Sequence, residues 1–221
     1  MNNIELIFPE IFISLSVMFL LILGVFKKNS SKIIHNISLI VLLITAVITF
    51  NETISVNRTT LFNESIVVDY LSSFMKIITL IAAFVVLLIS SNYLKTFKIF
   101  KIEYPILILS SVLGMMIMIS SNDLIVFYMG LELQSLALYV LATFNRDQLK
   151  SSEAGLKYFV LSALSSGLLL YGCSLIYGFT GSTNFNVIAT QFNTNEYALT
   201  FGIVFVLVGL AFKISAVPFH M

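Results

Sequence analysis

Seven apolar stretches, each close to the length that crosses a bilayer, constrain this chain more than any other feature. They cover residues 7–26, 34–50, 70–90, 105–120, 124–141, 154–178 and 198–220. A transmembrane helix needs about 20 predominantly apolar residues. Backbone groups cannot stay unpaired in lipid, and the sequence lacks the alternating pattern of a membrane barrel. It therefore predicts an all-α, polytopic membrane bundle of about seven helices.

The composition agrees with a membrane protein. Apolar residues make up 58% of the chain and charged residues only 10%, whereas soluble domains carry roughly 25% charged residues. The formal net charge of +1 gives no indication of nucleic acid as a partner. Cys173 is the single cysteine and lies in an apolar stretch, so we expect a buried, unreactive thiol. The sequence shows no phosphate-binding loop, metal-ligand cluster or nucleophile with an adjacent base.

Basic residues in the connecting segments predict the orientation. Those after the first, third and fifth stretches are Lys27, Lys28, Lys32, Lys95, Lys98, Lys101, Arg146 and Lys150. Segments on the other side carry only Arg58. Because Lys and Arg are enriched in loops on the cytoplasmic side, we expect the N-terminus to face outward and the seventh helix to run inward.

Two ionisable residues near the middle of these stretches are candidate functional residues. A charge inside a bilayer is costly unless it is paired or hydrated, so Glu132 and Lys213 are expected to lie in a proton or ion pathway. Gln134 and Ser135 extend a polar patch beside Glu132. The alternatives are a purely structural pair for Glu132 and, for Lys213, a side chain that reaches to the membrane surface.

Pro218 predicts a break in the seventh helix. It cannot donate a backbone hydrogen bond, so the carbonyl of Ile214 loses its helical partner and the helix should kink or end just after Lys213. A half-helix that ends there directs the negative end of its dipole toward the ammonium, as many transporters do near the membrane midplane. Lys213 is therefore the predicted proton carrier.

Four further ionisable residues are candidates for structural or functional roles. Glu153 and Lys157 are spaced i,i+4 with the acid first, which fits a salt bridge on the helix surface or a place in the pathway. Lys76 is expected to be structural or to reach toward the membrane surface. His220 follows the expected break and can relay protons, because its unperturbed pKa is near 6.5.

Three segments resemble a known family. They are residues 127–142 (FYMGLELQSLALYVLA), 153–172 (EAGLKYFVLSALSSGLLLYG) and 212–221 (FKISAVPFHM). They resemble NADH dehydrogenase subunit 2 of respiratory complex I, which is called subunit N in bacteria. Weaker similarity extends back through the first three apolar stretches.

The resemblance implies an antiporter-like membrane-arm subunit built from two related units of inverted topology. It divides this chain into residues 1–103, with the first three helices, and residues 104–221, with helices four to seven of an incomplete first unit. It pairs Glu132 with Lys213 and also ties Lys157 to proton movement. Separation of the Glu132–Lys213 pair would lower the proton affinity of the lysine and pass a proton along a hydrated axis.

The implied function is proton translocation within NADH:ubiquinone oxidoreductase, with no redox centre in this chain. NADH, FMN, iron–sulfur clusters and ubiquinone would bind elsewhere in the complex, and the chain itself is expected to hold no cofactor or metal. Expected partners are the other membrane-arm subunits and membrane lipids, with no nucleic acid. Because the sequence stops midway through the family pattern, a separate polypeptide carrying the C-terminal half is expected, with a truncation as the alternative.

Two other functions stay open. One is a subunit of a multisubunit cation/proton antiporter, and the other is a structural half-subunit without transport. Abundant Ile, Phe, Asn and Lys, with no Trp, favour an AT-rich organelle genome. The expected location is therefore the mitochondrial inner membrane, with the N-terminus facing the intermembrane space; the bacterial plasma membrane is the alternative.

Overall fold

The computed structural model describes residues 5–26, 31–55, 58–97, 99–191 and 196–217. Its helices are α1 (Phe8–Phe26), α2 (Ser31–Ser55), α3 (Tyr70–Thr96), α4 (Glu103–Ser120), α5 (Leu124–Ala142), α6 (Leu149–Thr180), α7 (Phe185–Gln191) and α8 (Glu196–Lys213). A single turn, η1 (Glu5–Ile7), precedes α1, and an antiparallel hairpin of β1 (Thr59–Leu61) and β2 (Ile66–Val68) precedes α3. The predicted all-α membrane bundle is confirmed.

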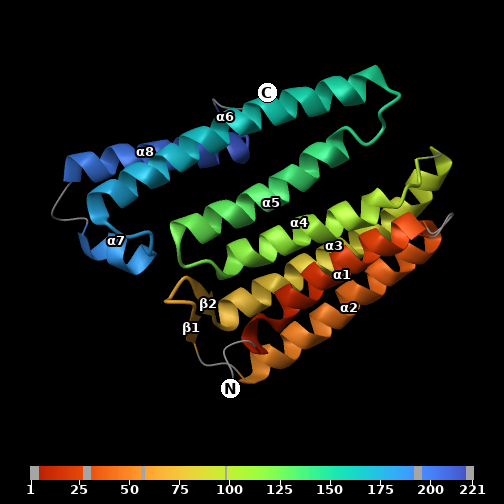
Figure 1. Cartoon of the computed structure of the whole chain (residues 1–221), viewed down its shortest axis with the longest axis horizontal. Coiled ribbons are helices and arrows are strands. Elements are labelled where there is room, and N and C mark those ends of the chain that lie inside the picture. The colour runs from red at the N-terminus through yellow and green to blue at the C-terminus, as the bar shows by residue number, and fades with distance from the viewer. Residues whose placement is uncertain (1–4, 27–30, 56–57, 98, 192–195, 218–221) are drawn as a thin grey trace.

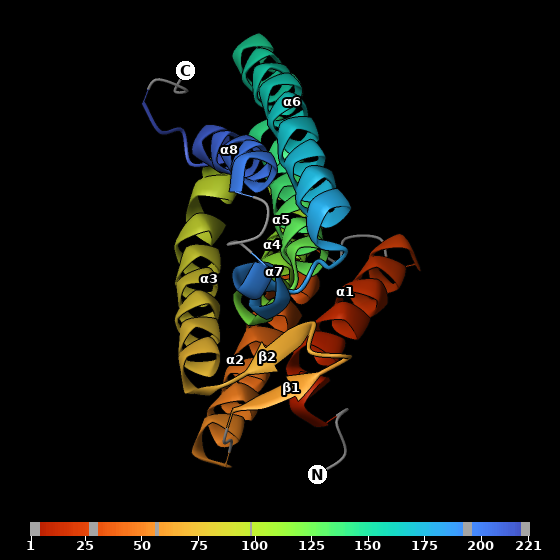
Figure 2. The ribbon, with the colours of Figure 1, turned by 90° about the vertical axis from the view of Figure 1, so that its left-hand side faces the viewer.

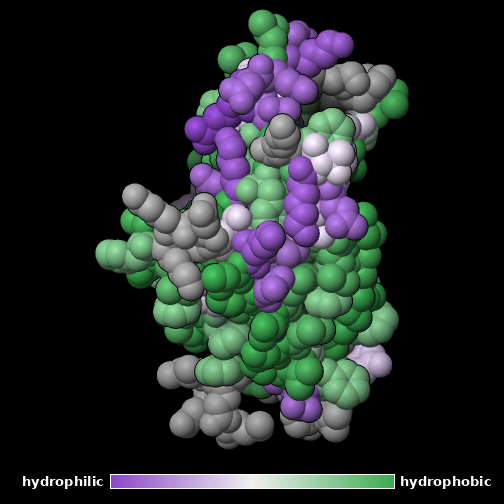
Figure 3. All heavy atoms as spheres, turned by 90° about the vertical axis from the view of Figure 1, so that its right-hand side faces the viewer, coloured by the Kyte–Doolittle hydropathy of each residue, from purple (hydrophilic) through white to green (hydrophobic). Residues whose placement is uncertain are grey.

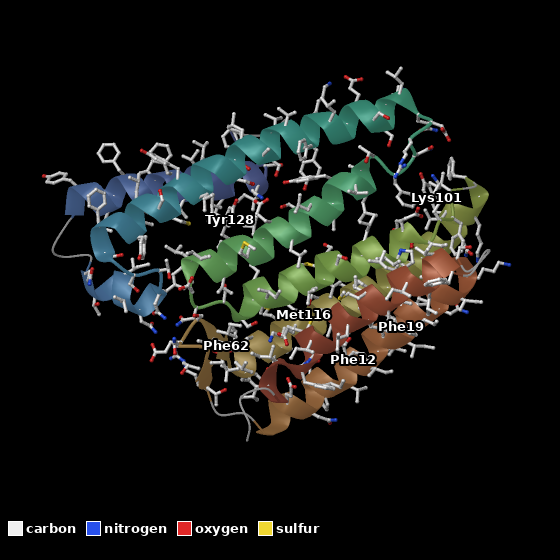
Figure 4. All side chains as sticks on the ribbon, in the orientation of Figure 1. Phe12, Phe19, Phe62, Lys101, Met116 and Tyr128 are labelled. Carbon is white, nitrogen blue, oxygen red and sulfur yellow. The ribbon has the colours of Figure 1, made fainter. Side chains whose placement is uncertain are left out.

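Long antiparallel helices dominate the molecule (Figure 1). Within the described residues, α1 to α6 are long and apolar enough to cross a membrane, and the shorter α8 is also apolar. These elements correspond to the seven predicted stretches. Large apolar side chains stay exposed along the outside of the bundle; Phe19 of α1, labelled in Figure 4, is 57% exposed. Such side chains suit contact with lipid.

The helices form two packed groups. In the first group α1 and α3 each pack against both α2 and α4, which gives a four-helix arrangement. In the second group α8 packs along α6, and α5 contacts both α4 and α6. The core of the first group consists of Ile13, Leu20, Ile34, Val41, Leu42, Leu80, Ala83, Leu87, Ile106, Leu109, Val112 and Met116. The core of the second consists of Leu124, Leu131, Leu169, Cys173, Ile176 and Leu199. The division of the chain at residue 103 stays a prediction.

One end of the bundle, which we call the hairpin end, is closed by the hairpin and the α6–α7 connection. Figure 2 shows the hairpin and α7 on this face. The side-chain amides of Asn122 and Asn184 donate to the carbonyl of Glu64 at 2.8 and 3.1 Å. The backbone N–H of Leu124 donates to the carbonyl of Thr183 at 2.9 Å. These bonds tie the starts of α5 and α7 to the hairpin.

Helix caps fix where two of the helices begin. The carboxylate of Asp123 accepts from the backbone N–H of Ile125 at 2.8 Å and caps α5. Asp69 and Ser72 form a reciprocal capping box at the start of α3, with bonds of 2.7 and 2.9 Å. Each cap satisfies N–H groups that have no partner within the helix. These caps hold the first turns of α5 and α3 at the hairpin end.

The opposite end, which we call the basic end, carries the α3–α4 and α5–α6 connections. Hydrophilic side chains gather over it where α6 begins (Figure 3). Lys101, labelled in Figure 4, lies at this end with its ammonium 6.0 Å from the centre of the Phe144 ring. Among the described residues, Lys101 and Arg146 of these connections therefore lie at the same end of the bundle, and the orientation of that end in the membrane stays a prediction.

Two features at the hairpin end were not predicted. The connection between α6 and α8 includes the short helix α7, which lies outside the seven predicted stretches. The hairpin also went unpredicted because its turn uses three consecutive left-handed residues, Phe62, Asn63 and Glu64, with φ of 50°, 52° and 65°. Residues other than glycine seldom adopt that conformation. Contacts with the α4–α5 turn hold it in place.

Glycines bring the helices into backbone contact. A Cβ at Gly114 of α4 would lie 2.6 Å from the backbone nitrogen of Gln134 in α5, and one at Gly130 would lie 2.8 Å from that of Met118. A Cβ at Gly209 of α8 would lie 3.0 Å from the carbonyl oxygen of Ser165 in α6. Small residues allow such close approach in membranes. They set the positions of α5 and α8, which carry Glu132 and Lys213.

We expect Gly114→Ala to destabilise the protein by about 1–3 kcal/mol, because the methyl group would overlap the backbone of α5. Gly167→Ala is the control, since a Cβ at Gly167 meets no atom within 4 Å. This change should be neutral or stabilising by up to about 1 kcal/mol. Thermal unfolding of both variants in the same detergent measures the difference. Equal melting temperatures would refute the close-packing argument.

Candidate proton-transfer site

The two mid-helix charges predicted from the sequence form an ion pair. The ammonium of Lys213 lies 2.6 Å from Oε1 of Glu132, and the two side chains are 8% and 20% exposed. The pair joins the last residue of α8 to the middle of α5. Burial of both groups in a low dielectric makes their mutual attraction strong and the loss of either partner costly.

The end of α8 explains the position of the lysine. The N–H of Ala216 bonds to the carbonyl of Ala211 at 2.9 Å, and that of Ser215 bonds to the carbonyl of Phe212 at 3.1 Å. Ser215 is left-handed, with φ of 52°. This pattern is a Schellman cap, which ends a helix and satisfies some of its last carbonyls. The helix ends at Lys213, as predicted, and its negative dipole end faces the ammonium. Pro218 lies outside the described residues.

Hydroxyl groups surround the ion pair. Lys213 donates to Ser135 Oγ at 3.1 Å, and Ser135 in turn donates to the carbonyl of Leu131 at 2.8 Å. The hydroxyl of Ser166, from α6, lies 2.5 Å from Glu132 Oε1 and 2.8 Å from the carbonyl of Ser162. A single hydroxyl hydrogen serves one of these acceptors at a time. Ser166 can therefore turn toward or away from the carboxylate.

Further hydroxyls lead from the ion pair toward the basic end. Tyr139 of α5 donates to the hydroxyl of Ser162 on α6, and both side chains are buried. Tyr139 also lines an open cleft of about 370 Å³ between α5 and α6, together with Thr143 and Ser152. Near the other side of the pair, Tyr128 packs against the second core (Figure 4). The polar groups thus extend from Glu132 to a cleft at the surface.

Lys157 does not join this cluster in the structure. Its ammonium lies 2.6 Å from Glu153 on the same helix, and the two side chains are 58% and 54% exposed. Nine residues of α6 separate Lys157 from Ser166, which corresponds to about 14 Å along the helix. The geometry is that of an i,i+4 pair on the surface. His220 lies outside the described residues. The pathway roles of Lys157 and His220 stay predictions.

The sequence analysis did not predict the contact of Ser166 with Glu132 or that of Lys76 with Glu10. Ser162, Ser165 and Ser166 recur at helical spacing on one face of α6, and this pattern is a signal that could have revealed the hydroxyl cluster. Lys76 does not reach the membrane surface, since its side chain is 3% exposed and lies 2.5 Å from Glu10. Of the two interpretations of Lys76, a structural position inside the bundle is therefore the one that fits.

The described residues contain no group of His, Cys, Asp and Glu side chains suited to a metal ion. Cys173 is a buried free thiol, 3% exposed, among the apolar side chains of the second core. The chemistry of the site therefore rests on the ion pair and its hydroxyls. Carboxyl, ammonium and hydroxyl groups are chemically able to exchange protons.

Known proteins resemble this chain in sequence. The profile of the NADH:quinone oxidoreductase/Mrp antiporter transmembrane family matches residues 121–221. NADH-quinone oxidoreductase subunit N of Pelagibacter ubique (strain HTCC1062) is 72% identical over 221 residues, which are 100% of this chain and 47% of that protein. The chain thus spans about half the length of this curated relative.

Solved structures share the fold. A chain of respiratory complex I from Thermus thermophilus matches 96% of this chain and 45% of its own length, with 25% identity and a TM-score of 0.80. A chain of the Mrp complex from Dietzia sp. DQ12-45-1b matches 100% of this chain and 42% of its own length, with 22% identity and a TM-score of 0.80. At 22% identity, the similarity to the Mrp chain concerns the fold alone.

The buried pair at the end of a half-helix lies in a polytopic membrane bundle, and residues 121–221 match the profile of the NADH:quinone oxidoreductase/Mrp antiporter transmembrane family. Over its whole length, the chain is a relative of the N-terminal half of NADH-quinone oxidoreductase subunit N, as the three motifs predicted. The curated relatives are bacterial, so the expected mitochondrial location is not supported. An AT-rich composition does not separate an organelle genome from a bacterial one.

We expect replacement of one partner of the pair to lower the stability of the fold more than replacement of both partners. Lys213→Met leaves the carboxylate of Glu132 without its ammonium, which costs about 3–5 kcal/mol when a pair is buried. Glu132→Gln combined with Lys213→Met removes both charges and should recover most of that loss. Thermal unfolding in detergent compares the three proteins. If the double variant is as unstable as Lys213→Met, the pair is not the source of the destabilisation.

Proposed function

We propose that this chain is a proton-translocating part of the membrane arm of an NADH-quinone oxidoreductase. The observation that carries the proposal is the buried Glu132–Lys213 pair at the end of a half-helix. The 72% identity to a curated subunit N supports it. The chain contributes to an enzyme complex whose redox chemistry takes place in other subunits. NADH, FMN, iron–sulfur clusters and ubiquinone are assigned to those subunits.

The proposed mechanism uses the pair as a switch. While Glu132 is ionised and close, it stabilises the ammonium of Lys213. Movement of the carboxylate, or its protonation, removes that stabilisation and the lysine releases its proton. Ser166 supports the exchange because its hydroxyl has a second acceptor available in the carbonyl of Ser162. Tyr139 and Ser162 supply a route from the basic end.

Other parts of the arm complete the site. Ile214 and Val217, just past the end of α8, are 76% and 80% exposed. Irregular backbone at membrane depth is tolerated only against protein or a hydrated cavity. We therefore assign a covering of further helices to this surface, corresponding to the remaining length of the relatives. A second polypeptide with those helices is one form of this proposal, and mass spectrometry of the native complex distinguishes it from one continuous chain.

The alternatives from the sequence are weaker. The Mrp chain, which represents the antiporter alternative, is 22% identical to this chain, far below the 72% found for subunit N. A structural half-subunit without transport does not require a buried ion pair surrounded by hydroxyls. An apolar contact of the same shape is often equally stable. Proton translocation in a respiratory complex accounts for both observations.

We expect Lys213→Ala to lower proton translocation by on the order of 100-fold, because it removes the carrier. Glu132→Gln should also lower proton translocation. Assembly of the complex should fall much less. The measurement is the rate of proton uptake by vesicles that contain the native complex, normalised to the assembled complex. Tyr139→Phe, which removes one hydroxyl, should slow uptake by the proposed route.

Two controls accompany this experiment. Lys150→Ala removes an exposed lysine at the basic end, and Asp147→Asn removes an exposed acid of the α5–α6 connection; neither should change translocation. Full translocation by an assembled Lys213→Ala complex would contradict the proposed function. Equal losses in Lys150→Ala and Lys213→Ala would show a nonspecific effect of charge removal.

We also propose that the chain lies in a bacterial plasma membrane with its basic end toward the cytoplasm. The basic residues of its connections are the reason. Single cysteines at Lys150 and Asn186 test this orientation with a membrane-impermeant thiol reagent applied to intact cells. Cys173 is 3% exposed and should contribute little background. We expect labelling at position 186 and protection at 150. The reverse pattern would overturn the orientation.

A further inference from the structure

A cleft of about 180 Å³ opens at the basic end of the bundle, separate from the ion pair that joins α5 and α8. Helix α4 packs against both α1 and α5 and lies between them (Figure 1). The first turns of α4 contribute Ile106 and Leu107 to the lining, and the neighbouring helices contribute Leu21 and Val140. The cleft therefore lies along α4, with α1 on one side and α5 on the other.

The walls of the cleft are apolar and open to the outside of the bundle. Ile106 is 4% exposed, whereas Leu21 and Val140 are 48% and 44% exposed. The helices that carry Leu21 and Val140 are long and apolar enough to cross a membrane. In a bilayer, exposed apolar side chains of such helices contact acyl chains, which are as apolar as leucine. Lipid can therefore enter the cleft from the side.

Two cationic side chains from different connections meet at this cleft. Lys101 precedes α4 and Arg146 follows α5, and both are exposed. The ammonium of Lys101 lies 6.0 Å from the centre of the Phe144 ring, which also lines the cleft. This cation–π contact holds the ammonium beside the apolar walls. The lining includes one acid, Glu103, in the first turn of α4, where the helix dipole favours a negative charge.

Lys101 and Arg146 have hydrogen-bond donors available for a ligand. Within the part of the chain that the structure describes, neither side chain takes part in a salt bridge. A guanidinium can donate to two oxygens of a phosphate at once, and an ammonium adds a compact positive charge beside it. These groups therefore fit a phosphate, and the apolar walls next to them fit a hydrocarbon chain.

A phospholipid combines a phosphate with hydrocarbon chains. In a zwitterionic phospholipid, a cation of the headgroup already lies close to the phosphate and competes with the cations of the protein. An anionic phospholipid has no such internal partner, so its phosphate gains more from Lys101 and Arg146. Basic pockets between transmembrane helices on the cytoplasmic side are known to bind anionic headgroups.

We propose that this cleft binds one anionic phospholipid from the membrane leaflet at the basic end. Its phosphate lies between Lys101 and Arg146, and an acyl chain follows Leu21 and Val140 along α4. Because α1 belongs to the first group of helices and α5 to the second, the lipid bridges the two groups at the basic end, as the hairpin does at the other end. The site takes no part in proton transfer and is independent of the function proposed for Lys213.

Site-specific photocrosslinking in the complete complex tests the proposal. A photoreactive amino acid replaces Leu136, which is 50% exposed and lies one turn before Val140 on the same face of α5. The complex is placed in vesicles of phosphatidylcholine with a minor fraction of phosphatidylglycerol. After illumination, mass spectrometry of the peptide that contains position 136 measures the share of each lipid among the adducts. We expect phosphatidylglycerol to be enriched on the order of fivefold over its share in the vesicles.

Two double variants show whether the enrichment depends on the cleft. Lys101→Ala with Arg146→Ala should reduce phosphatidylglycerol to its share in the vesicles. Lys95→Ala with Lys150→Ala is the matched control, because it removes two exposed cations at the same end that do not line the cleft. This control should keep the enrichment. If the first double variant does not assemble, Lys101→Gln with Arg146→Gln replaces it, since glutamine keeps most of each side-chain stem.

Three outcomes would overturn the proposal. One is a wild-type share of phosphatidylglycerol equal to that in the vesicles. Another is an equal loss of enrichment in both double variants, which would assign the effect to the general positive charge of the basic end. The third is the formation of adducts with another polypeptide in place of lipid, which would show that a protein covers the cleft. Because proton translocation is not measured, its failure in the Lys213 experiments leaves this result intact.

Discussion

A charge buried within a membrane protein must be neutralised by the protein itself, and this requirement determines how the helices of this chain meet. Helix α8 packs along α6, held close at Gly209, while α5 packs against α4 at Gly114 and Gly130. The salt bridge between Lys213 and Glu132 joins the end of α8 to α5. The close helix contacts bring the two charges within reach, and the cost of separating them holds the arrangement.

The end of α8 combines two conditions that are unfavourable separately. A helix that ends inside a membrane leaves carbonyl groups without partners, and a lysine at that depth is an expensive charge. Together they compensate each other, because the Schellman cap satisfies part of the helix end and the ammonium suits its negative dipole. The left-handed Ser215 has a cost of about 1–3 kcal/mol. Such a cost is tolerated where the neighbouring contacts fix the backbone.

The sequence predicted the features that depend on local pattern. Each apolar stretch became a helix, because a run of about 20 apolar residues in lipid has few alternatives. The end of α8 at Lys213 was also predictable from Pro218. The bridge from Glu10 to Lys76 was not, because the two residues are far apart in sequence and no local pattern specifies which buried acid meets which buried base. The hairpin turn likewise depends on contacts with Asn122 and Asn184.

The two buried ion pairs lie in different groups of helices, and α4 stands between these groups. Glu132 and Lys213 join α5 to the end of α8. Glu10 and Lys76 join α1 to α3. Between the two groups of helices, backbone contact at Gly114 and Gly130 leaves little space for a chain of water. A proton therefore has no direct path at this contact from one centre to the other. Helix α4, which touches α1 and α3 on one side and α5 on the other, and the hairpin, which is bonded to Asn122 and Asn184, are the structural connections between the two centres.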